Sequence, residues 1–189
     1  MTTRSQYYTA TTLDGFIADE DNSLEWLFAV ESGPEDRFAP FFAQVGAMAM
    51  GATTYEWIVA HEKLVEQPGK WQEWYGATPA WVFTHRELPV LPGAAITFVR
   101  GDVRPVHQAM TEAAGGRNIW LAGGGALVGA FADEGLLDEI VLGVAPVTLG
   151  AGAPLLPRRI TSSRLTLTAV EQVGQFAYLT YGVGPVGSD

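Results

Sequence analysis

The stretch that decides the fold is IWLAGGGALV, residues 119–128. Its first four residues predict a buried strand, and the apolar residues after the glycines predict a helix. Glycines at such a junction let a phosphate approach the backbone, and the helix start supplies oriented N–H donors and partial positive charge. A tight turn without a ligand would need the same glycines. The pattern matches neither G-x-G-x-x-G nor a Walker loop, so both interpretations stay open.

A second junction of this kind lies in AMAMGATTY, residues 47–55. A short apolar run ends at Gly51, and Thr53 and Thr54 stand where a helix is expected to begin. Simple N-capping by the threonines would explain this pattern. Two such junctions in one α/β domain also favour a dinucleotide site, because a pyrophosphate can lie between two helix N-termini.

Predicted strands and helices alternate along the chain. The expected strands are 7–12, 47–50, 80–84, 95–99, 118–122 and 136–147, and the expected helices are 34–45, one beginning near 53, 105–114 and 126–132. Residues 60–76 show no clear period and are expected to form a surface loop. Residues 165–173 and 176–183 predict a C-terminal antiparallel hairpin. This order predicts an α/β fold with a mixed, mainly parallel sheet covered on both faces.

Composition limits the class of protein. The chain has 189 residues, of which 48% are hydrophobic and 17% charged, as expected for one domain spanning residues 1–189 with a filled core. No stretch approaches the roughly 20 apolar residues of a membrane span. The first residues show no apolar signal-peptide segment, and the chain has no cysteine. We therefore expect a cytoplasmic protein that does not bind membranes.

The net charge of -10 argues against a nucleic-acid partner, which needs a basic face. Any bound phosphate must therefore be met locally, by helix N-termini or by a few of the 11 lysines and arginines. The three histidines, His61, His85 and His107, lie in dissimilar segments without ligand spacing, so no metal site is expected.

The order of these motifs resembles that of the dihydrofolate reductase superfamily over nearly the whole chain. Residues 10–18, ATTLDGFIA, resemble the family's first strand and mobile active-site loop, residues 50–55 its second phosphate turn, and residues 123–125 its glycine turn. From Ala122 to Gly150 the chain is most similar to the reductase domain of the bifunctional riboflavin-biosynthesis deaminase–reductase. The resemblance implies a three-layer α/β/α fold.

The resemblance also implies NADPH as the cofactor and assigns its contacts. Ala10 and Ile17 would lie beside the nicotinamide ring. In this family the first two glycines of the turn are joined by a cis peptide, which here falls between Gly123 and Gly124. The residues that the resemblance places around the pyrophosphate are Gly51, Thr53, Thr54, Gly123, Gly124, Gly125, Ala126 and Leu127.

Thr84, His85 and Arg86 follow a predicted strand at the point where the family binds the adenosine ribose and its 2′-phosphate. Arg86 is the first candidate for that phosphate and Arg100 the second, because arginine meets phosphate in a bidentate manner. Both arginines could equally lie in solvated loops without binding a phosphate. The family usually has arginine where this chain has Ala52, which leaves the preference for NADPH over NADH open.

The resemblance places a carboxylate for proton donation at the start of the first long helix. Counting back from the Gly51 turn gives Glu35, with Asp36 adjacent, and Asp14 is an alternative on the loop. Acidic residues after Pro34 would also complement the helix dipole without any catalytic role.

The function implied is an NADPH-dependent reductase of a small heterocycle, either a pterin or folate-like compound or 5-amino-6-(5-phosphoribosylamino)uracil of riboflavin biosynthesis. The alternatives are a non-catalytic module that senses a dinucleotide or folate, and a flavin-binding protein. A homodimer is expected, because the strand at 140–147 and the hairpin leave a sheet edge to protect and the nearest family members pair through this end.

Overall fold

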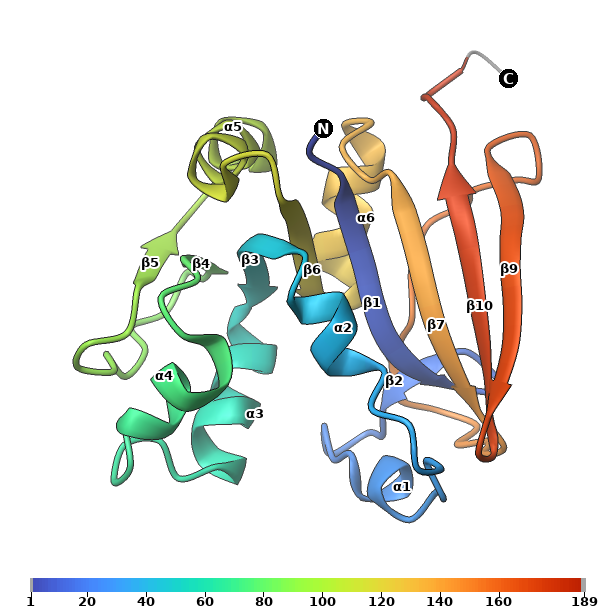
Figure 1. The fold of residues 1–189 in the computed structure, drawn as a ribbon, viewed down its shortest axis with the longest axis horizontal. Helices are drawn as coiled ribbons and strands as arrows, with labels where there is room; N and C mark the ends of the chain where they lie inside the picture. Colours follow the sequence, from blue (N-terminus) through green and yellow to red (C-terminus); the bar gives the residue numbers. More distant parts are fainter. Residues whose placement is uncertain (1, 188–189) are drawn as a thin grey trace.

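One mixed sheet of eight strands forms the middle layer of the computed structural model, which describes residues 2–187 (Figure 1). Its spatial order is β5-β4-β3-β6-β1-β7-β10-β9. The pairs from β5 across to β7 are parallel, and β10 is antiparallel to both of its neighbours. The strands are β1 (Ser5–Thr12), β3 (Val45–Gly51), β4 (Ala80–Phe83), β5 (Ile96–Val99), β6 (Asn118–Gly123), β7 (Glu139–Ala145), β9 (Leu165–Val173) and β10 (Phe176–Val183).

Helices cover both faces of this sheet, and successive strand residues point to opposite faces. Ile119 and Leu121 of β6 pack with α5 (Val103–Ala114) and α6 (Gly125–Asp133) in one apolar cluster. Trp120, between them, packs in a second cluster with α2 (Phe38–Phe42), α3 (Ala52–His61) and α4 (Gly69–Tyr75). The expected three-layer α/β/α fold with its C-terminal hairpin is therefore confirmed.

Several predicted elements differ from those observed. The helix predicted over 34–45 is reduced to α2, because the Asp36 carboxylate accepts the N–H groups of Phe38 and Ala39 and the chain enters β3 at Val45. The predicted loop at 60–76 contains α4, which buries Trp71. Short elements that were not predicted are α1 (Glu25–Phe28), β2 (Phe16–Ala18) and β8 (Ala153–Pro154).

The capping role expected of Thr53 and Thr54 is wrong. Helix α3 begins one residue after Gly51, and no side chain caps it. The strand expected over 136–147 is shorter, because β7 begins at Glu139 and ends before Pro146, whose ring cannot donate to a ladder. Within residues 2–187, no helix has the length and apolarity needed to cross a membrane.

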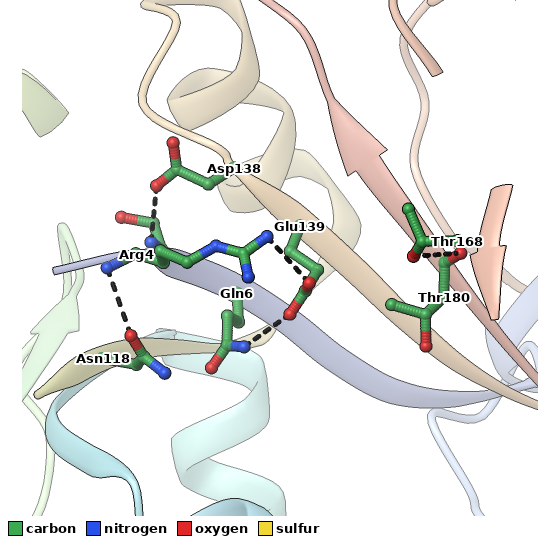
Figure 2. A network of polar contacts seen from close by, with 8 residues as sticks. Arg4, Gln6, Asn118, Asp138, Glu139, Thr168 and Thr180 are labelled. Carbon is green, nitrogen blue, oxygen red and sulfur yellow. Dashed lines mark hydrogen bonds and ion pairs between the residues drawn. The ribbon is translucent and has the colours of Figure 1, made fainter. Parts of the chain in front are cut away.

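A polar network ties the amino-terminal ends of the central strands together (Figure 2). Arg4 forms an ion pair of 2.8 Å with Glu139, and Gln6 also donates to this carboxylate. Asp138 accepts the main-chain N–H of Ser5 at 2.7 Å, and Asn118 accepts that of Arg4. These contacts link the strands at one end of the sheet, whereas the glycine turn lies at the opposite end of β6.

Candidate cofactor-binding cleft

A cleft of about 390 Å³ opens at the carboxyl ends of the parallel strands. This end of an open α/β sheet is where ligands ordinarily bind. Its walls come from the β1–β2 region, the loop before α1, the start of α3, the glycine turn with the start of α6, and β8 with the segment after it. The lining residues are Thr9, Ile17, Ala18, Asn22, Leu24, Gly51, Ala52, Thr53, Thr54, Trp57, Ala122, Gly124, Gly125, Ala126, Leu127, Ala153, Pro154 and Pro157.

The three glycines of the turn differ in what their missing side chains permit. The Gly123–Gly124 peptide is cis, as the resemblance implied, and Gly123 has a φ of 119° that side chains rarely adopt. A Cβ on Gly124 would face the cleft, 3.8 Å from Cδ1 of Ile17. A Cβ on Gly125 would lie 2.4 Å from the main-chain oxygens of Pro154 and Leu155. The turn thus brings the backbone to the cleft surface without side chains in between.

Two helix N-termini meet at this turn. Helix α3 has Gly51 as its N-cap and α6 has Gly124, and neither first turn receives a hydrogen bond from a capping side chain. A Cβ on Gly51 would lie 3.8 Å from both the Gly123 oxygen and the Gly124 nitrogen, so the two turns are adjacent. Uncapped N–H groups and the partial positive charge of two adjacent helix N-termini suit an anion such as a pyrophosphate.

The cleft itself is uncharged. Among the lining residues that the structure describes, none has a carboxylate, an ammonium, a guanidinium or an imidazole group. Its polar side-chain groups are threonine hydroxyls, the amide of Asn22 and the indole N–H of Trp57. Anion binding here would therefore depend on backbone N–H groups rather than on paired side-chain charges.

An aromatic stack supports the wall of the cleft that contains Trp57 and Leu24. Trp57 of α3 lies face to face with His61 at 4.5 Å, and Phe28 of α1 stacks on the same imidazole at 5.3 Å. This contact holds α1, and with it the lining residue Leu24, against α3. The sequence pattern did not predict α1, so this wall was missed.

Thr84, Arg86 and Arg100 line a second hollow, at the ends of β4 and β5. Thr84 is buried, and its hydroxyl accepts the Arg86 N–H at 2.9 Å and donates to the Arg86 carbonyl at 3.0 Å. The Arg86 guanidinium forms an ion pair of 2.8 Å with Glu56 of α3. His85 is exposed. Arg86 therefore lies at the surface beside α3, the helix whose N-terminus lines the main cleft.

The three carboxylates singled out as proton donors are not among the residues that line the cleft. Asp14 accepts hydrogen bonds from the Thr12 hydroxyl at 2.6 Å and from the N–H groups of Leu149 and Gly150. The Thr12 hydroxyl, followed by these N–H groups, lowers the pKa of Asp14. The Asp36 carboxylate accepts the N–H groups of Phe38 and Ala39 at the start of α2, and Glu35 beside it is exposed.

The segment at 153–157 completes the cleft and was not predicted from the sequence. Strand β8 pairs with β2 through Phe16 and Pro154, and the Leu155 N–H donates to the Gly15 carbonyl at 2.9 Å. This places Pro154 and Pro157 opposite the glycine turn. Ala10 lies next to the lining residue Thr9 and is half-buried.

Residues 6–179 match the protein family described as the RibD C-terminal domain. The chain belongs to this family. It is 31% identical over 188 residues to the uncharacterized protein YwjB of Bacillus subtilis (strain 168), covering 96% of this chain and 98% of that protein. Family membership confirms the resemblance seen in the sequence and supports an oxidoreductase of the reductase type.

Two solved structures show the same fold. A putative riboflavin biosynthesis protein from Shewanella sp. PV-4 superposes with a TM-score of 0.78 at 24% identity, covering 96% of this chain and 99% of that one. Dihydrofolate reductase from Enterococcus faecalis, in complex with NADP(H), superposes with a TM-score of 0.56 at 14% identity, covering 97% and 98%. This chain thus shares its overall fold with both proteins.

Proposed function

We propose that this member of the RibD C-terminal domain family is an NADPH-dependent reductase of a small heterocycle. The substrate is either a pterin-like compound or 5-amino-6-(5-phosphoribosylamino)uracil. The observation that carries the proposal is the meeting of two uncapped helix N-termini at a glycine turn whose Gly124 presents bare backbone to the cleft. The similar fold of a dihydrofolate reductase in complex with NADP(H) also supports it.

The residues present suit a nicotinamide dinucleotide. The N–H groups that follow Gly51 and Gly124 would hold the pyrophosphate, with the Thr54 hydroxyl beside them. Ile17, and Ala10 next to the lining residue Thr9, would flank the nicotinamide ring. When bound, the cofactor supplies a hydride, so the protein's own contribution is position and exclusion of water.

The hollow at Thr84 is the site proposed for the 2′-phosphate. Arg86 is the leading ligand and Arg100 the second, since both line it. Arg86 is already paired with Glu56, so the phosphate would have to compete with that carboxylate for the guanidinium. This competition limits the expected preference for NADPH over NADH.

We also propose that the protein forms a homodimer through the hairpin edge. Strand β9 is the last strand of the sheet, and its Leu167 and Val170 are exposed. An exposed strand edge with apolar side chains invites pairing with another strand, and a second copy of the chain would cover it.

The competing function is a dinucleotide sensor without turnover, because no acid or histidine lines the cleft among the described residues. Tryptophan fluorescence and absorbance at 340 nm distinguish the two. In a reductase, NADPH binding quenches the tryptophan fluorescence. The bound NADPH is then oxidised, with loss of absorbance at 340 nm, when a dihydropterin precursor or the pyrimidine substrate is added. A sensor binds NADPH and oxidises none. Absence of NADPH binding would refute both functions.

A further inference from the structure

Two short segments lie side by side and together form one wall of the cleft. The first, residues 13–18, contains β2, which follows the carboxyl end of β1 and supplies Ile17 to the lining (Figure 1). The second, residues 149–157, contains β8 and supplies Pro154 and Pro157. The separation between these two segments therefore sets the shape of this wall.

Both segments also approach the glycine turn. Cδ1 of Ile17 lies 3.8 Å from the position of a Cβ on Gly124. The main-chain oxygens of Pro154 and Leu155 lie only 2.4 Å from the position of a Cβ on Gly125. Displacement of either segment would therefore change the space in front of the turn.

Main-chain bonds between the two segments are few. Strands β2 and β8 pair at two positions only, and the register is irregular between them. On one side of this ladder the Leu155 N–H donates to the Gly15 carbonyl at 2.9 Å. On the other side the Leu13 N–H donates to the Val147 carbonyl at 2.7 Å. Because an isolated two-stranded ladder is at best marginally stable, a further contact is needed to fix the separation.

The Asp14 carboxylate supplies this contact. Its Oδ2 accepts the N–H groups of Gly150 at 2.7 Å and Leu149 at 3.1 Å. Its Oδ1 accepts the Thr12 hydroxyl at 2.6 Å, and the Thr12 oxygen in turn accepts the Phe16 N–H at 2.9 Å. Within the part of the chain that the structure describes, no other side-chain hydrogen bond joins the two segments. One carboxylate thus ties the start of the second segment to the turn that precedes β2.

The surroundings of Asp14 suit a fixed acceptor rather than a proton donor. The Thr12 hydroxyl, and then the N–H groups of Gly150 and Leu149, lower the pKa of this carboxyl group. Asp14 is therefore ionised at neutral pH and has no proton to give. Hydrogen bonds to an ionised acceptor are roughly twice as strong as those between neutral groups, so this contact can hold segments that the short ladder holds only weakly.

We propose that Asp14 is a positioning residue for the nicotinamide cofactor, and that its carboxylate holds Ile17 and Pro154 at the separation at which the cleft admits the cofactor. This rests on the proposed function, which places the nicotinamide ring beside Ile17 and the pyrophosphate at the glycine turn. Asp14 itself neither contacts the cofactor nor exchanges a proton. Without the carboxylate the two segments separate in part of the molecules, and the apparent affinity falls with the fraction that keeps the competent arrangement.

Asp14→Ala tests this role through NADPH titrations followed by tryptophan quenching. The variant removes both acceptor oxygens and should weaken NADPH binding about tenfold, as expected if about one tenth of the molecules keep the competent arrangement. Charge alone acts in the opposite direction, because removing a carboxylate from a protein of net charge -10 favours an anionic ligand. Asp102→Ala is the matched control and should not weaken binding, because Asp102 is exposed and its side chain does not cap α5.

Hydrogen exchange of the 149–157 segment gives a measurement that does not depend on the cofactor. Without NADPH, exchange should be fastest in Asp14→Ala and slowest in the parent. Asp14→Asn keeps one acceptor oxygen for the N–H groups of Leu149 and Gly150, and should lie between them. The NADPH affinities of the three proteins should follow the same order, and urea midpoints should show that all three are folded.

Parental NADPH affinity in Asp14→Ala would overturn the proposal even if exchange became faster, because the contact would then stabilise the segments without positioning the cofactor. Affinities that do not follow the order of exchange would overturn it as well, as would an equal loss in Asp102→Ala. Absence of NADPH binding by the parent protein would overturn the proposed function and the role of Asp14 together. The parent titration therefore distinguishes the two failures.

Discussion

Gly125 packs so closely against Leu155 that a Cβ on the glycine would lie 2.4 Å from the Leu155 main-chain oxygen. One residue earlier, a Cβ on Gly124 would meet only Cδ1 of Ile17, at an ordinary contact distance of 3.8 Å. Neighbouring glycines thus serve different purposes. Gly125 permits the close approach of the 153–157 segment, and Gly124 leaves the cleft surface bare.

Substitution at these two glycines should separate folding from binding. Gly125→Ala forces the backbone at Pro154 and Leu155 to move and should lower the free energy of unfolding by about 1–3 kcal/mol. Gly124→Val should change stability little and abolish NADPH binding, because its side chain enters the space proposed for the pyrophosphate. Urea unfolding and tryptophan quenching measure the two effects. Tight NADPH binding by Gly124→Val would contradict the assigned site.

Arg86 should discriminate between the two nicotinamide cofactors. A charge-assisted contact to phosphate contributes about 1.5–3 kcal/mol, or roughly ten- to a hundredfold in affinity. Arg86→Ala should weaken NADPH binding by this factor and leave NADH binding unchanged. Glu56→Gln should strengthen NADPH binding, because it frees the guanidinium from its ion pair.

Titrations of both cofactors at one salt concentration measure this preference, since exposed charges are screened. Arg104→Ala is the matched control, because Arg104 is a similarly exposed arginine that pairs with Glu134, away from the hollow. Equal losses for NADPH and NADH in Arg86→Ala would mean that Arg86 supports the loop rather than binding the phosphate.

Stability should fall on mild acidification because of His107. Its Nε2 lies 2.9 Å from the Ser5 hydroxyl, and burial lowers the pKa of this imidazole. Below the ordinary histidine pKa of about 6.5, the unfolded chain takes up a proton that the folded protein resists, so stability is lost as the pH falls.

Urea midpoints at pH 7.5 and pH 5 test this contribution. His107→Gln should reduce the difference between the two midpoints, whereas substitution of the exposed His85 by glutamine should preserve it. An unchanged difference in His107→Gln would assign the acid sensitivity to other groups.

The hairpin edge should determine the oligomeric state. Light scattering should give a mass near twice the 20.3 kDa of one chain. The double substitution Leu167→Lys and Val170→Lys places two charges on β9 and should yield monomers. Val90→Lys, at an apolar position outside β9 that is more exposed than either, should remain dimeric. A parent protein of 20 kDa at micromolar concentration would refute the dimer.

Local sequence determined the features whose cause is local. A strand that ends in three glycines before a helix already specifies the turn, because backbone freedom and helix N–H groups belong to those residues themselves. The order of strands and helices similarly restricts the sheet to a mainly parallel arrangement. Both α6 and the C-terminal hairpin were predicted for this reason.

Tertiary structure decided everything that depends on contacts between distant segments. The phenylalanine pattern at 34–45 predicted a long helix, but hydrogen bonding of Asp36 to the start of α2 and entry into β3 at Val45 leave only α2. Pairing of β8 with β2 brings Pro154 to the cleft, and the missing side chain of Gly143 lets Tyr178 reach across a strand towards Tyr8. The hydrophobic periodicity of the sequence does not predict such contacts, because they form only when the strands are assembled side by side.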